Sequence, residues 1–112
     1  MPRYLISFDD GAMTFPDEDL PALVEASHRV VREARDAGVW VFGGGLESQR
    51  ASVVAPDGTV TDGPYPETKA VLGGFSIIDV PARGDALEWA ARIAAACRCA
   101  QEVREIMPDS TD

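Results

Sequence analysis

Residues 71–80 read Val-Leu-Gly-Gly-Phe-Ser-Ile-Ile-Asp-Val, and most of these side chains are apolar. Only Gly73, Gly74, Ser76 and Asp79 interrupt the apolar run. A nearly continuous apolar run is typical of a strand that is covered on both faces, because neither face then needs polar side chains. We therefore predict that residues 71–80 form a central strand of a sheet.

The residues before this strand, 61–69, read Thr-Asp-Gly-Pro-Tyr-Pro-Glu-Thr-Lys. Gly63 permits backbone angles that other residues resist, whereas Pro64 fixes its own φ. A residue that precedes a proline is pushed towards an extended conformation. These restrictions predict that Asp62 is held in a stiff turn that leads into the strand.

The spacing of apolar residues predicts the other elements on either side. Strands are predicted at residues 3–8, 39–46, 51–55 and 100–106, and helices at residues 18–37 and 85–97. Gly38 is the expected end of the first helix, and Asp85 with Glu88 matches a capping box at the start of the second. The turn at residues 56–59, Pro-Asp-Gly-Thr, predicts a hairpin in the middle of the chain.

This order of elements is βαββαβ with an inserted turn before the fourth element. It predicts an α+β fold of the ferredoxin-like type, an antiparallel sheet with two helices on one face. With 112 residues the chain is long enough for one domain. We assign residues 1–107 to that domain and residues 108–112 to a short C-terminal tail.

The charge of the chain argues against polyanionic partners. It has 19 acidic and 10 basic residues, a net charge of −9, which repels nucleic acid and anionic membrane surfaces. Apolar residues make up 46%, but no run approaches the roughly 20 residues that span a bilayer. Residues 1–10 are too short and too charged for a secretory signal, so we predict a cytoplasmic protein.

The sequence predicts no cofactor and no metal. Cys97 and Cys99 are too close to form an unstrained disulfide with each other, and they are too few for a four-ligand metal site. They are interpreted as ordinary buried or half-buried thiols, with a redox or adventitious metal role as the alternative. The glycines at 43–45 do not form a phosphate loop, because neither a helix nor a Lys-Ser/Thr pair follows them.

A sheet with both helices on one face needs cover for the other. Alternation along residues 39–42 places Trp40 and Phe42 on one side of their strand and Val39 and Val41 on the other. Both sides are therefore apolar, and an exposed apolar face of that size indicates an interface. A self-complementary contact is the commonest solution, so we predict a homodimer.

His28 and Asp62 are the candidate catalytic residues. His28 is the only histidine, and its place at the border of the apolar stripe of the first helix would let it line a cleft. The alternative is a half-exposed histidine on a helix flank. Asp62 could orient His28 or act as a general base, or its carboxylate could merely cap backbone N–H groups of the turn.

Tyr65 and Lys69 are the candidate substrate-binding residues. Lys69 could hold an anionic group of a substrate, although a solvated loop with a weak contact to Glu67 is the alternative. Tyr65 is on the predicted loop and is a better candidate for a site than for the core, whereas the other aromatic residues are needed by the sheet.

The string Asp62-Gly63-Pro64-Tyr65, followed by Glu67-Thr68-Lys69 and Gly73-Gly74-Phe75, resembles the DGPF branch of the YCII-related proteins. That resemblance implies a dimeric α+β barrel in which two sheets pair face to face, with a cleft near the interface. It also implies a His and Asp pair in the cleft with the His on the first helix, and His28 matches this position. Some DGPF relatives are associated with sigma factors, which makes a sigma factor a candidate partner.

Two functional hypotheses follow. The first is a cofactor-free enzyme that binds a small anionic or aromatic molecule and uses His28 and Asp62 for elimination, isomerisation or hydrolysis. The second is a non-catalytic binding or regulatory module. A haem or quinone monooxygenase of the same barrel type is disfavoured, because no second metal-ligand candidate accompanies His28.

Overall fold

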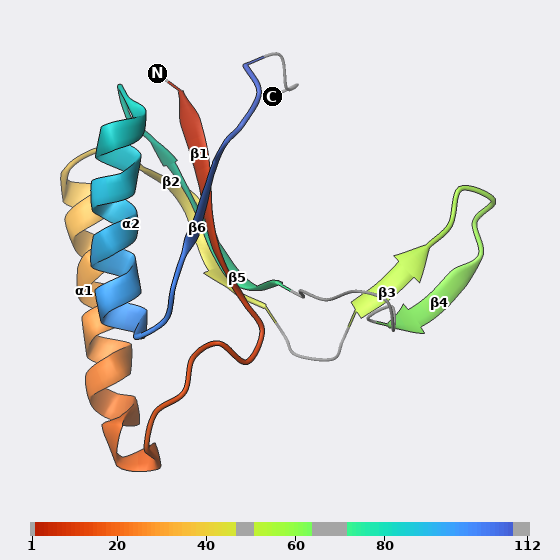
Figure 1. Ribbon diagram of the computed structural model, residues 1–112, viewed down its shortest axis with the longest axis horizontal. Helices are drawn as coiled ribbons and strands as arrows, with labels where there is room; N and C mark the ends of the chain where they lie inside the picture. Colours follow the sequence, from red (N-terminus) through yellow and green to blue (C-terminus); the bar gives the residue numbers. More distant parts are fainter. Residues whose placement is uncertain (1, 47–50, 64–71, 109–112) are drawn as a thin grey trace.

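A four-stranded antiparallel sheet with two helices on one face forms the body of the protein (Figure 1). The computed structural model describes residues 2–46, 51–63 and 72–108. The sheet contains β1 (Arg3–Asp9), β2 (Trp40–Gly45), β5 (Leu72–Asp79) and β6 (Glu102–Glu105). The helices are α1 (Leu20–Asp36), preceded by the 3-10 turn η1 (Asp17–Asp19), and α2 (Arg83–Cys97). A separate hairpin pairs β3 (Ala51–Val54) with β4 (Val60–Gly63).

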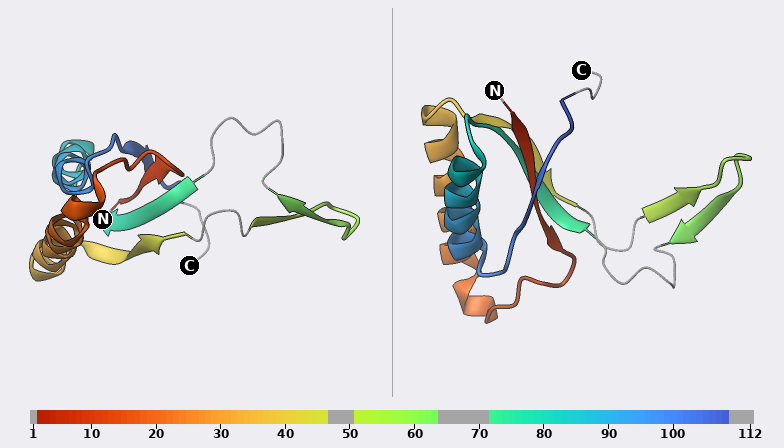
Figure 2. Two further views of the ribbon diagram at one scale, coloured as in Figure 1. Left: turned by 90° about the horizontal axis from the view of Figure 1, so that it is seen from below. Right: turned by 45° about the horizontal axis from the view of Figure 1, so that its top comes forward.

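The sheet order is β2-β5-β1-β6, and every pair is antiparallel. Without the hairpin the element order is βαββαβ, so the predicted ferredoxin-like arrangement is confirmed. The prediction that residues 71–80 form a central strand is also confirmed, because β5 lies between β1 and β2. Both helices pack against the same face of the sheet, and no helix of the described residues lies on the other face (Figure 2). Among the described residues, no helix has the length and apolar character needed to cross a membrane.

The helix ends show how local sequence sets the boundaries. α1 ends before Gly38, whose φ of 76° is the left-handed conformation that glycine adopts freely. α2 begins at Arg83, two residues before the predicted start, because Asp85 is not the cap. Its Oδ2 accepts the backbone N–H of Ala82 at 3.1 Å, so Asp85 occupies the third helical position and no role for Glu88 in a cap is seen. The predicted capping box at Asp85 and Glu88 is therefore wrong.

The core lies between the helices and the sheet. Tyr4 and Ile6 of β1 and Ile78 of β5 are buried against Ala86 and Ala90 of α2. Tyr4 pairs across the sheet with Ile78, which places both side chains on the helix face. Burying these large side chains against small alanines lets α2 approach the sheet closely.

The prediction that Trp40 and Phe42 share a face of the edge strand β2 is wrong. The register shifts between these residues, so Trp40 is opposite Ile78 whereas Phe42 is opposite Ile77. Consecutive residues of β5 face opposite sides, and the bulge at Val41 therefore sends Trp40 to the helices and Phe42 to the open face. Phe42 is 63% exposed, and its ring lies 5.8 Å from that of Phe75.

The hairpin of β3 and β4 projects from the body, and among the described residues these two strands pair with each other and not with the main sheet (Figure 1). The predicted turn around Asp62 is wrong: Asp62 lies in β4 and pairs with Ser52, because the strand continues to Gly63. The turn that uses an aspartate side chain is at the other end of the hairpin. There the Oδ1 of Asp57 accepts the backbone N–H of Thr59 at 2.9 Å.

Candidate functional site

A cavity of about 380 Å³ lies between the sheet and the two helices. It exists because β2 presents Gly43 and Gly45 to the helix face, where side chains would otherwise fill the space. Its volume falls in the lower part of the range for small-molecule pockets, roughly 300–1,000 Å³. The cavity can therefore hold a small organic molecule.

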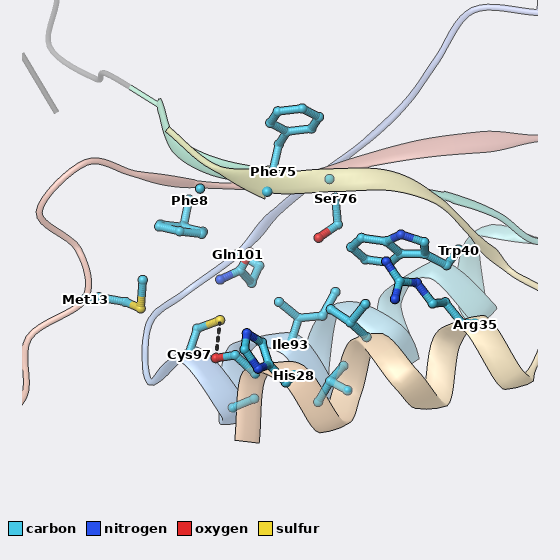
Figure 3. Close-up of a pocket in the computed structure, with 17 residues that line it drawn as sticks. Phe8, Met13, His28, Arg35, Trp40, Phe75, Ser76, Ile93, Cys97 and Gln101 are labelled. Atoms are coloured by element: carbon cyan, nitrogen blue, oxygen red, sulfur yellow. Dashed lines mark hydrogen bonds between the residues drawn. The ribbon is translucent and has the colours of Figure 1, made fainter. Parts of the chain in front are cut away.

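Aromatic and aliphatic side chains form most of the cavity wall, and Phe8 and Trp40 supply flat surfaces beneath the sheet (Figure 3). Phe75 contributes its backbone, since its ring points to the open face. The remaining lining residues are Met13, Ser27, His28, Val30, Val31, Arg35, Gly43, Gly44, Gly45, Ser76, Ile93, Ala96, Cys97 and Gln101. A few polar groups in an apolar wall are typical of a ligand site.

His28 lies in the middle of α1 and lines this cavity. Because its side chain is also exposed, the cavity opens to solvent beside it. Helical periodicity predicted this border position, and the prediction that His28 could line a cleft agrees with the structure. The preceding residue, Ser27, places its Oγ 3.7 Å from the Sγ of Cys97 on α2, which links the two helices at the cavity wall.

The two cysteines are free, half-buried thiols, as predicted. Cys97 lines the cavity. Burial raises the pKa of Cys99, as does the neighbouring Cys97, and the hydrogen bond that Gln101 donates to the Cys99 sulfur acts in the opposite direction. Cys99 is therefore a protonated thiol at neutral pH, and Cys97 is the sulfur that faces the cavity.

The sequence did not predict Arg35, Cys97 or Gln101 as lining residues, and Trp40 was assigned to the sheet core in preference to a pocket. Arg35 follows His28 by seven residues, which is two turns of helix, so this spacing was a readable signal for a second group on the same side. The cavity-facing position of Trp40 could not be predicted, because strict alternation places it on the side of Phe42 and the bulge reverses this.

The family comparison accords with this fold. A model of the YCII-related domain matches residues 3–109, nearly the full length of the chain. The chain belongs to the YCII-related family. A search of curated proteins found no significant match.

In this YCII-related protein the two predicted catalytic residues are not brought together within one chain. His28 lines the cavity, whereas Asp62 is exposed on β4 and is not among the cavity residues. Figure 1 shows α1 and the β3–β4 hairpin at opposite ends of the molecule. Tyr65 and Lys69 lie outside the described residues.

Proposed function

We propose that this YCII-related protein binds a small aromatic or anionic molecule in the cavity between the helices and the sheet, and that His28 performs cofactor-free acid–base chemistry on it. Elimination, isomerisation and hydrolysis are the reaction types that such chemistry serves. The observation that carries the proposal is the position of the single histidine at the opening of a largely apolar cavity.

Imidazole is suited to this role because its ordinary pKa lies near neutrality, so one side chain can accept and return a proton. The apolar walls would hold the ligand, and Ser27, Ser76 and Gln101 place polar groups in the same wall. The reacting carbon or oxygen of the ligand would lie at the His28 end, where the ring can reach it.

Asp62 could assist His28 in this chemistry only if it came from a second chain. The open face of the sheet carries Phe42, Phe75 and Ile77, and a second copy placed there would cover these apolar side chains. We propose a homodimer formed by this face. The β3–β4 hairpin of each chain would then be free to approach its partner, which is how Asp62 could come near His28.

The projecting hairpin favours a second candidate function, a binding or regulatory module. Val54 and Val60 pair directly across the hairpin and are 64% and 60% exposed, so they form an apolar surface outside the body. A sigma factor is the partner that the DGPF resemblance suggests. Co-expression with such a factor, followed by size-exclusion chromatography, should give a complex that a Val54→Ser, Val60→Ser variant cannot form.

The enzymatic proposal can be tested without knowing the substrate. Weakly acidic lactones, hydroxyquinols and aromatic acids are incubated with the protein in D2O, and deuterium incorporation is read by mass spectrometry. Catalysed exchange that is present in the wild type and lost in His28→Gln supports acid–base chemistry. The matched control is Arg29→Gln, because Arg29 lies next to His28 on α1 but pairs with Glu25 at 3.8 Å outside the cavity.

Equal, detectable exchange by His28→Gln and the wild type would end the proposal that His28 transfers protons at carbon, as elimination and isomerisation require. Asp62→Asn should reduce exchange in the dimer only if the partner's hairpin reaches the cavity. In every variant the melting temperature must match that of the wild type, so that lost exchange is not lost folding.

A further inference from the structure

The cavity differs in charge from the rest of the molecule. The chain has 19 acidic residues, yet no aspartate or glutamate is among the described residues that line the cavity. The ionisable groups there, apart from the Cys97 thiol, are His28 and Arg35, which can only be neutral or positive. In a protein of net charge −9, a wall with this composition is more compatible with an anionic ligand than with a cationic one.

Arg35 is available for such an anion. Three other arginines on the helices or just after them have protein partners: Arg32 contacts Glu25 at 3.4 Å, Arg98 contacts Asp19 at 2.8 Å, and Arg92 lies over the ring of Trp89. Arg35 is the arginine among the described residues that line the cavity. Within the described part of the chain, no carboxylate lies within ion-pair distance of Arg35. A guanidinium that faces a cavity without a carboxylate partner has donors to offer to a ligand.

The positions of the lining side chains indicate how a ligand would be oriented along the cavity. Arg35 and Trp40 lie at one end of the cavity, and His28 and Cys97 lie towards the other (Figure 3). Arg35 follows His28 by seven residues, which corresponds to about 10 Å along the helix axis. A flat ligand can therefore have an anionic group at Arg35 and a reacting group near His28.

We propose that Arg35 binds the carboxylate of a planar aromatic acid, whose ring lies beside Trp40 and whose far end points to His28. This inference rests on the proposed function and names its ligand class. A planar guanidinium matches a carboxylate with two parallel hydrogen bonds, which a lysine or a histidine cannot reproduce. The aromatic wall then favours a ring over an aliphatic chain.

The test compares acids with their uncharged amides of the same shape. Benzoate, cinnamate, 2-naphthoate and indole-3-acetate are each titrated beside the corresponding amide, and binding is followed by the NMR signals of the His28 imidazole, the only one in the chain. The wild type should bind at least one acid about five- to tenfold more tightly than its amide, as expected for a partly exposed charge-assisted pair. Arg35→Gln should lower this ratio to about one without weakening amide binding.

Arg32→Gln is the matched control, because it removes the same charge from the same helix on the side of Glu25. It should keep the preference for the acid. Unchanged amide binding by Arg35→Gln would show that the cavity of this variant is intact. If such a variant still prefers the acid to the amide, the proposal is overturned.

A second readout uses the cavity thiol. In a Cys99→Ser background, a bound acid should slow alkylation of Cys97 by N-ethylmaleimide, and the same acid concentration should give no protection when Arg35 is also changed to Gln. If acids and amides bind the wild type equally and both shift the His28 signals, the assignment of Arg35 fails while the ligand site stands. If no compound shifts those signals or protects Cys97, both proposals fail.

Discussion

Gly43 occupies a position where any side chain would collide with the neighbouring strand. A Cβ at this residue would lie 2.5 Å from the carbonyl oxygen of Phe75 and 2.8 Å from the Cα of Ser76. Both contacts are with backbone atoms, which cannot move aside without distorting β5. Gly43→Ala should therefore lower the free energy of unfolding by about 1–3 kcal/mol, as measured by urea denaturation.

Gly45→Ala is the control for this prediction. Gly45 is in the same strand and faces the same side, but a Cβ there would meet only the carbonyl oxygen of Gly73, at 4.0 Å. The free energy of unfolding should change by less than about 1 kcal/mol. If the free energy of unfolding falls equally in the two variants, the backbone contacts at Gly43 are not the cause of the loss.

Single residues were predictable where local periodicity governs them. The position of His28 follows from its angle on α1, because a helix of this length keeps a fixed period. The position of Trp40 could not be read in this way, since the bulge at Val41 depends on how β2 pairs with β5. Asp62 was misplaced for a related reason: pairing with Ser52 outweighed the turn signals of Gly63 and Pro64.

At the scale of the elements, the turn of the β3–β4 hairpin should respond to acid. The hydrogen bond from the backbone N–H of Thr59 holds the pKa of Asp57 below its ordinary value of 3.8. The charged form is thus favoured in the folded state, and its contribution is present above pH 3.8 and is lost as the pH falls through the lowered pKa. The Thr59 amide signal, followed by NMR, should titrate with a midpoint below pH 3.8.

Asp57→Ser separates the charge from the hydrogen bond. Serine retains an oxygen that can accept from Thr59 but does not titrate, so the acid transition of the Thr59 signal should disappear while the hairpin remains. A midpoint at or above pH 3.8 in the wild type would contradict the role of this bond.

The predicted elements fall within a few residues of the observed ones, but the cavity between them could not be predicted. It depends on Gly43 and Gly45 facing the helices, which the bulge decides, and on the approach of α2 to β1 and β5. These are contacts between residues far apart in the chain. Sequence patterns report which residues form a helix or a strand, whereas they do not report where packing leaves space.

The whole molecule is more extended than a compact domain of its length. Its radius of gyration is 15.5 Å, whereas a compact chain of this size is expected near ~13 Å. The projecting hairpin accounts for this shape (Figure 2). An isolated two-stranded hairpin is only marginally stable in water, so this arm is expected to gain contacts in an assembly.

The dimer proposal makes a prediction about mass. The wild type should sediment at equilibrium with twice the 12.0 kDa mass of the chain. Phe42→Glu should give a monomer, because twofold symmetry would bury two carboxylates at the sheet interface without partners. Leu87→Glu places the same charge on α2, at a residue that is 46% exposed on the helix side, and it should remain a dimer. A wild-type monomer, or a Phe42→Glu dimer, would show that the open sheet face does not bind a second copy.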